Sequence, residues 1–331
     1  CNSGNANTCN PNGEEIANAV CGLCAKELGI DENDIIVAST GVIGQPLDLA
    51  PFENHMNELV QALHSQGSSD ACEGIMTTDT VKKEYAVEFE IDGVTCHIGA
   101  IAKGSGMIHP NMATMLAFVT SDVNISKEML NEVIHEVVDD TFNMVSVDGD
   151  TSTNDMLSVM ANGLANNKEI VQKDESYHIF KDALMYICEL LSKGIAKDGE
   201  GATKLLTCHV NNACSQKDAK VVAKSVITSS LFKAAMFGKD ANWGRILCAI
   251  GYCEASYDVD KIEVTLASSA GSILVCQNGR GYPFDEDQAL KILSEDEIEI
   301  LIDLHDGNYQ ATAWGCDLTY DYVKINGDYR T

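Results

Sequence analysis

A glycine-rich segment in the first third of the chain, residues 103–116, delivers one hydroxyl to the start of an apolar run. It reads Lys-Gly-Ser-Gly-Met-Ile-His-Pro-Asn-Met-Ala-Thr-Met-Leu. Pro110 and the two glycines rule out a regular helix through the turn. Thr114 therefore lies at the edge of an apolar segment, where a bent backbone could face a nucleophile. A surface loop that enters a buried strand explains the same residues, because threonine is common in strands.

Two other positions could serve the same chemistry. A predicted strand at 34–38 runs into Thr40-Gly41, and such a strand end leaves backbone N–H groups free, as an oxyanion hole requires. Glu200 lies between two glycines, where a carboxylate can approach a ligand closely. An ordinary turn and an exposed acid are the alternatives. Strand ends that converge on one face are how α/β and α+β enzymes build sites.

Other polar features favour structure over chemistry. Residues 147–155 form the densest polar cluster, but they lack the spaced carboxylates and final glutamate of a calcium loop. Cys21 and Cys24 form a single CxxC without a second pair, so helix packing explains them better than zinc. No GxSxG elbow, P-loop or HExxH motif is present. His109 is a lone histidine, for which we expect a structural role.

Hydrophobic periodicity and turn residues divide the chain into alternating helices and strands. We expect strands at 34–38, 74–80, 85–91, 93–102 and 205–211, with the third and fourth paired as a hairpin through Asp92-Gly93. We expect helices at about 13–28, 51–65, 126–142, 176–195 and 216–231. Residues 260–325 are strand-rich, with one acidic helix at about 285–292. The pattern predicts a mixed α+β fold.

Composition excludes several classes of protein. The chain has 331 residues and a formal net charge of −28, which argues against nucleic acid and anionic membranes as partners. No apolar run approaches the ~18 residues that a membrane span needs. Thirteen scattered cysteines fit free, mostly buried thiols in a reducing cytoplasm. The length allows one large domain or two, and any division lies near residues 190–200.

Seven motifs together resemble the ornithine acetyltransferase family of arginine biosynthesis, some members of which also act as N-acetylglutamate synthases. They occur in one order along essentially the whole chain, at 39–44, 76–80, 102–116, 147–155, 199–204, 242–246 and 326–331. The family begins several tens of residues before the position of Cys1.

The resemblance implies a layered α+β fold, sheets flanked by helices, of the self-cleaving, N-terminal-threonine-nucleophile type. Cleavage between Ala113 and Thr114 would give an α chain (1–113) and a β chain (114–331). The new α-amino group, with an unperturbed pKa of ~8, can act as the base for the Thr114 hydroxyl. N2-acetyl-L-ornithine would donate its acetyl group to Thr114, and L-glutamate would then accept it.

The resemblance also assigns residues to roles. Thr40 and Gly41 would form the oxyanion hole. The substrate-binding residues would be Thr77, Lys103, Thr114, Glu200, Asn326 and Thr331. It implies no metal and no cofactor, with acetyl-CoA as an alternative acetyl donor that the motifs do not test. The expected assembly is a heterotetramer of two α and two β chains.

Two competing hypotheses predict different outcomes. A related self-processing aminopeptidase, or amidase, would pass the acyl group to water in place of glutamate. A non-enzymatic, acidic, cysteine-rich binding protein would neither cleave itself at Thr114 nor form an acetyl-enzyme. Glu200 and the 326–331 tail favour the transferase.

Overall fold

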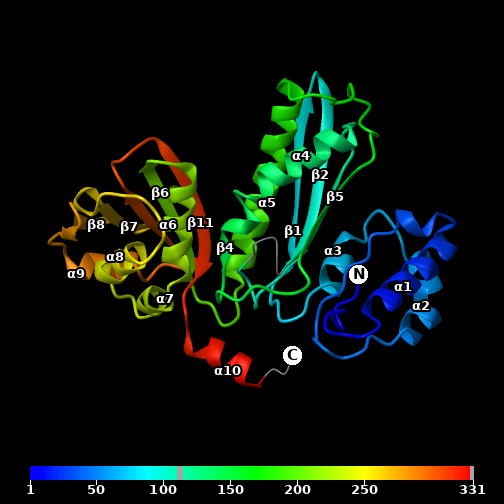
Figure 1. Ribbon diagram of the computed structural model, residues 1–331, viewed down its shortest axis with the longest axis horizontal. Helices are drawn as coiled ribbons and strands as arrows, with labels where there is room; N and C mark the ends of the chain where they lie inside the picture. The colour runs from blue at the N-terminus through cyan, green and yellow to red at the C-terminus, as the bar shows by residue number, and fades with distance from the viewer. Residues whose placement is uncertain (110–114, 329–331) are drawn as a thin grey trace.

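A four-stranded sheet stands at the centre of the computed structural model, which describes residues 1–109 and 115–328 (Figure 1). Its strand order is β1 (Lys83–Ile91), β2 (Val94–Lys103), β3 (Leu116–Ser121) and β5 (Met156–Ala161). β1 and β2 form the predicted hairpin, in register from Lys83–Ala102 to Ile91–Val94. Asp92 and Gly93 both have positive φ, 51° and 78°, as a two-residue type I′ turn requires.

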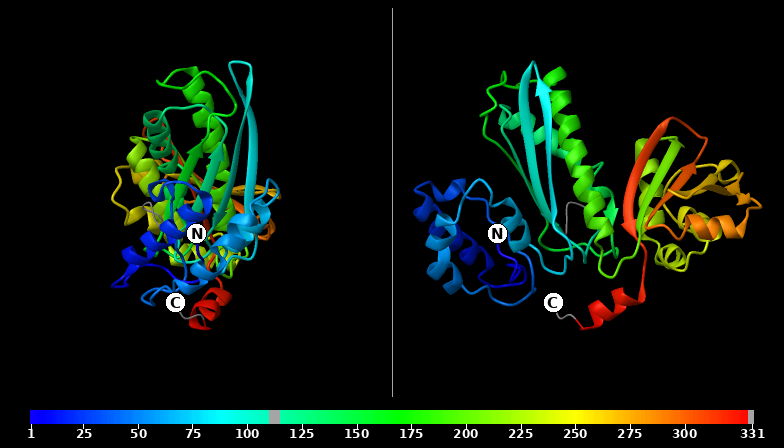
Figure 2. Two further views of the ribbon diagram at one scale, coloured as in Figure 1. Left: turned by 90° about the vertical axis from the view of Figure 1, so that its right-hand side faces the viewer. Right: turned by 180° about the vertical axis from the view of Figure 1, so that it is seen from behind.

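Two helices, α4 (Lys127–Val138) and α5 (Glu175–Lys197), accompany this sheet (Figures 1 and 2). α5 begins at Asp174, whose side chain accepts a hydrogen bond from the Tyr177 amide. Its buried residues recur every three or four positions, from Tyr177 through Leu184 to Ile195, which is the apolar stripe of a helix that packs on a core. α5 contacts both β1 and β11, so it connects this sheet to the second one.

The second sheet is seven-stranded, in the order β4-β11-β6-β10-β7-β8-β9. Its strands are β4 (Val145–Ser146), β6 (Leu205–Ala213), β7 (Glu263–Ser268), β8 (Gly271–Gln277), β9 (Arg280–Gly281), β10 (Glu297–Asp303) and β11 (Tyr309–Cys316). α6 (Gln216–Thr228) packs on β6 and β11, and α7 (Ser230–Phe237) and α8 (Trp243–Gly251) contact α6. α9 (Glu286–Ile292) contacts β7 and β8. The fold is thus α+β, with two sheets flanked by helices, as the sequence predicts. The domain boundary near residues 190–200 stays a prediction. The second sheet takes strands from both sides of it, because β4 precedes α5 in the chain.

The first part of the chain forms a separate lobe of α1 (Gly13–Leu28), a short 3-10 helix (Glu32–Asp34) and α2 (Ala50–Gln61) (Figure 1). The next helix, α3 (Ser68–Gly74), contacts β1 and β2. The predicted strand at 34–38 is wrong. Residues 35–38 belong to no strand, and the isolated bridges with the N-terminal loop come after them, between Asn2 and Ser39 and between Asn5 and Val42. Ile36 is 56% exposed, so this run of apolar residues does not form a buried strand.

Three further predictions need correction. The strand at 74–80 is wrong, because α3 ends there and the following turn is held by Asp79, whose carboxylate accepts the Thr77 amide hydrogen bond. The helix at 216–231 is broken, because Ser229 caps the new helix α7. The tail carries α10 (Tyr320–Asp328), which the strand-rich pattern at 260–325 did not predict.

Within residues 1–109 and 115–328, no helix is both long enough and apolar enough to span a membrane.

Candidate active site

A pocket of about 120 Å³ lies at one end of the four-stranded sheet. β2 ends here, and β3 and β5 begin here. The residues that line the pocket come from seven separate parts of the chain, and six of them are predicted site residues: Thr40, Gly41, Thr77, Lys103, Glu200 and Asn326. Ala113, Thr114 and Thr331 lie outside the described residues, so their predicted roles stay predictions.

Thr40 and Gly41 reach the pocket through contacts with the N-terminal loop. The Thr40 N–H donates to the Asn2 carbonyl at 3.0 Å, so the prediction that this backbone group is free is wrong. The Gly41 N–H has no acceptor in the described part of the chain. A side chain at Gly41 would collide with the Gly4 carbonyl, 2.3 Å from the ideal Cβ position. The donors available for an oxyanion are therefore the Thr40 hydroxyl and the Gly41 N–H.

Lys103 is buried at the end of β2, and its ammonium lies 3.3 Å from the Thr40 hydroxyl oxygen. Because that oxygen accepts the bond from Lys103, the Thr40 proton remains available to a ligand. Burial lowers the pKa of Lys103, and the carboxylate of Asp79 opposes this. A desolvated ammonium in a pocket suits a ligand carboxylate.

Glu200 lines the same pocket as Lys103 and lies in the turn that follows α5. Its backbone N–H donates to the Ser105 carbonyl at 2.9 Å. A Cβ at Gly106 would come within 2.4 Å of the Glu200 carboxyl group, so only glycine allows the carboxylate to sit there. Asn326, on α10, donates to Glu200 Oε2 at 2.8 Å. The C-terminal helix therefore contributes directly to the pocket.

Further polar side chains line the pocket, among them Asn154 and Thr78. Asn154 accepts a hydrogen bond from Thr8 and donates to Asn7, both at 2.7 Å, and so joins the N-terminal loop to the pocket. The Thr78 and Ser105 hydroxyls lie 2.6 Å apart. The dense polar run at 147–155 was a usable signal for Asn154, but nothing in the sequence marks Ser105 and Thr78 as neighbours.

Asp155 is the most unusual titratable group near the pocket. Within residues 1–109 and 115–328, neither of its carboxyl oxygens has a hydrogen-bond partner of good geometry. Burial raises the pKa of Asp155 to about 8, although the Lys103 ammonium and the Met115 amide oppose the rise. The carboxyl is therefore protonated in the folded protein at neutral pH.

This protonation predicts a pH-dependent loss of stability. In the unfolded chain an aspartate ionises near pH 3.9, whereas folded Asp155 ionises near pH 8. The folded state binds more protons between these values, so its stability falls as the pH rises through this window. Asp155→Asn should remove this dependence, a difference on the order of 3 kcal/mol after allowance for partial exposure. Calorimetric unfolding from pH 4 to 9 measures it. Asp150→Asn, at an exposed carboxylate of the same loop, is the control, and parallel curves for wild type and Asp155→Asn would contradict the assignment.

The remaining candidates have structural roles. Burial lowers the pKa of His109 to about 4, and its Nδ1 lies 3.1 Å from the Ser146 hydroxyl. Asp148 accepts the Met107 and Ile108 amides at 2.7 and 2.9 Å, which fixes the turn before residues 110–114. Among the residues described here, no group of three or more potential metal ligands is found.

A larger hollow, of about 630 Å³, lies between the end of α5 and α10. It is lined by Gly199 and Gly201 but by none of the predicted site residues. We assign the site to the smaller pocket because the six predicted site residues among the described ones converge there.

Comparison with known proteins identifies the family of this chain. A family model described as the ArgJ family matches residues 1–331. Arginine biosynthesis bifunctional protein ArgJ 1 of Clostridium acetobutylicum is 51% identical over all 331 residues, which cover 81% of that relative. The ArgJ protein of Caldanaerobacter subterraneus subsp. tengcongensis is 49% identical, with 82% of its length covered. The crystal structure of ArgJ from Bacillus halodurans is 45% identical and superposes with a TM-score of 0.62, over 65% of this chain and 100% of the solved one.

The fold and these relatives define an enzyme that acts on a small molecule. The chain belongs to the ArgJ family.

Proposed function

We propose that this protein is a glutamate N-acetyltransferase of arginine biosynthesis, an ornithine acetyltransferase that moves an acetyl group from N2-acetyl-L-ornithine to L-glutamate. The observation that carries this proposal is the pocket, in which Lys103 and Glu200 offer opposite charges beside the oxyanion donors of Thr40 and Gly41. Membership of the ArgJ family supports the same reaction.

Thr114 supplies the nucleophile in this proposal. Its hydroxyl first attacks the Ala113 carbonyl, and the peptide C–N bond breaks, which frees the Thr114 α-amino group and leaves an ester. Water then hydrolyses the ester to the Ala113 carboxylate and the free Thr114 hydroxyl. This amino group then takes the hydroxyl proton as Thr114 attacks the acetyl carbonyl. It returns the proton to the leaving amine of ornithine, and the acetyl group remains as an ester on Thr114. The amine of glutamate attacks that ester in the second half-reaction.

The substrate lies across the pocket. Lys103 binds the α-carboxylate that donor and acceptor share, because an ammonium in a dry pocket forms strong charge-assisted bonds. Glu200 pairs with the side-chain ammonium of ornithine. Asn326 donates one amide N–H to Glu200 Oε2 at 2.8 Å and the other to the Tyr322 carbonyl at 3.1 Å, so it exchanges one of these partners when it donates to the side-chain carboxylate of glutamate. Thr77 and Thr331 are the further substrate contacts that we propose.

The remaining proposals concern the whole assembly. Residues 1–113 form the α chain and 114–331 the β chain, in a heterotetramer of two of each. Acetyl-CoA serves as a second acetyl donor, for which the word "bifunctional" in the relatives' names gives support. A cytoplasmic location is favoured by the thirteen free cysteines. We propose no metal and no bound cofactor.

An acetyl-transfer assay separates this function from the amidase alternative. The purified protein is given N2-acetyl-L-ornithine carrying a labelled acetyl group, with and without L-glutamate. We expect labelled N-acetyl-L-glutamate only when glutamate is present, and little labelled acetate in either case. Equal release of acetate with and without glutamate would instead identify an amidase.

A further inference from the structure

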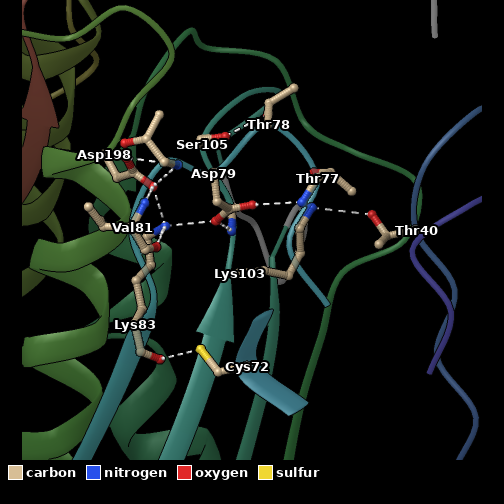
Figure 3. Close-up of polar contacts among 12 residues, drawn as sticks. Thr40, Cys72, Thr77, Thr78, Asp79, Val81, Lys83, Lys103, Ser105 and Asp198 are labelled. Carbon is tan, nitrogen blue, oxygen red and sulfur yellow. Dashed lines mark hydrogen bonds and ion pairs between the residues drawn. The ribbon is translucent and has the colours of Figure 1, made fainter. Parts of the chain in front are cut away.

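Lys83 is a buried cation that does not line the pocket. It opens β1 with 1% of its surface exposed. Its ammonium lies 2.7 Å from Asp79 Oδ1 and 2.6 Å from Asp198 Oδ2 (Figure 3). One ammonium thus joins two buried carboxylates that are 119 positions apart in the sequence.

Asp79 holds the part of the pocket that carries Lys103. Its Oδ1 accepts the Gly104 N–H at 2.6 Å, directly after Lys103, and its Oδ2 accepts the Thr77 N–H at 3.1 Å (Figure 3). Burial opposes the ionisation of Asp79, but the Lys83 ammonium and the Gly104 N–H outweigh it and keep the pKa of this carboxyl below its ordinary value. The charged Asp79 carboxylate therefore holds the backbone at Thr77 and directly after Lys103, which are two of the proposed substrate-binding residues.

Asp198, two residues before Glu200, holds the part of the pocket that carries Glu200. Its carboxylate accepts the Thr80 N–H at 3.0 Å and a short bond from the Thr80 hydroxyl. The end of α5, and with it the turn that carries Glu200, is thereby tied to the same segment that Asp79 organises. The two charged groups of the pocket are connected through Lys83.

Stability alone is a weak reason for such a cluster. Taking one ammonium and two carboxylates out of water is costly, and well-packed apolar residues often replace buried ion pairs with no loss of stability. Buried charges do, however, restrict geometry, because each must keep its partners. This cluster lies beside a pocket in which Lys103 and Glu200 are proposed to bind two charged groups of one substrate. A restricted geometry there would fix the distance between these two side chains.

We propose that Lys83, through Asp79 and Asp198, is a positioning residue that fixes the separation between Lys103 and Glu200 and so selects substrates of ornithine length. The proposal rests on the proposed function, because it takes Lys103 as the carboxylate site and Glu200 as the ammonium site. Lys83 touches neither substrate nor nucleophile in this account. It acts by keeping the two contacts at a fixed distance.

The test compares binding of L-ornithine with binding of L-lysine, which is one methylene longer. Isothermal titration calorimetry on the purified full chain gives both affinities without any need for turnover. Three variants loosen the cluster: Lys83→Met, Asp79→Asn and Asp198→Asn. Asp198→Asn keeps the Lys83–Asp79 pair and approximates the shape of the carboxylate, so it guards against a folding failure of Lys83→Met. Lys82→Met is the matched control, since Lys82 is the neighbouring lysine and pairs at the surface with Glu73.

In the wild type, one methylene should be worth about 10-fold or more in favour of ornithine. Each folded cluster variant should bind ornithine about tenfold more weakly, because a small misplacement of binding groups is costly, and its preference over lysine should fall below about 3-fold. In the transfer assay the variants should raise KM far more than they lower kcat. Lys82→Met should match the wild type.

Two results would overturn the inference while leaving the proposed function intact. One is a set of folded variants that keep the wild-type affinity and preference for ornithine. The other is a fall in kcat with KM and preference unchanged, which would give Lys83 a role in the chemical step. A wild-type protein that binds neither amine would overturn both the inference and the proposed ornithine site.

Discussion

Replacing Thr114 by alanine should leave the chain uncleaved and lower acetyl transfer by at least about 10⁴-fold, the scale on which enzymes lose rate with their nucleophile. The reason is that one hydroxyl performs both steps, self-cleavage and acetyl capture. Gel electrophoresis reports cleavage and the labelled-acetyl assay reports transfer.

Thr114→Ser is the matched control for this result, because it keeps a hydroxyl on a new N-terminal residue. It should still cleave, although more slowly, and retain measurable transfer. A Thr114→Ala chain that transfers acetyl groups at a rate near that of the wild type would remove Thr114 from the mechanism.

Replacing Thr40 by valine lowers kcat by about 10²- to 10³-fold, the usual cost of one oxyanion donor. Valine has nearly the same shape as threonine but cannot donate a hydrogen bond. The Thr40 backbone N–H is already bound to Asn2, so the hydroxyl is the donor that this residue can offer. Steady-state kinetics with N2-acetyl-L-ornithine and L-glutamate measure the effect.

The kinetic pattern distinguishes this role from substrate binding. Because the Thr40 hydroxyl also accepts a hydrogen bond from Lys103 at 3.3 Å, a modest rise in KM is expected with valine. Thr40→Ser should restore most of kcat. A valine variant that changes KM alone would mean that Thr40 supports Lys103 and does not stabilise the oxyanion.

The residues that motifs identified are brought together by ordinary features of the fold. Lys103 lies where the alternating pattern of β2 ends, and Glu200 follows the long apolar stripe of α5. Both positions could be predicted because the hairpin and the helix have strong periodic signals. Asn326 could be placed at the site only through the resemblance, since α10 buries no residue and has little periodic signal.

Other parts of the site could not be predicted from the sequence. The two predicted strands at 34–38 and 74–80 are turns and extended segments, because side-chain and loop contacts there replace a neighbouring strand. Asp79 and Lys83 are four residues apart, which is a local signal. Their partner Asp198 is joined to them only by the packing of α5 against β1, and a contact between residues so distant in sequence leaves no local pattern.

The central claim is that this chain forms an acetyl-enzyme on Thr114, and intact mass spectrometry of the purified protein before and after addition of N2-acetyl-L-ornithine tests it most directly. We expect two fragments that meet between Ala113 and Thr114, with an acetyl-sized gain in mass confined to the fragment that begins at Thr114. Addition of L-glutamate should reverse that gain. A single uncleaved mass without an adduct, or an adduct on the other fragment, would contradict the account.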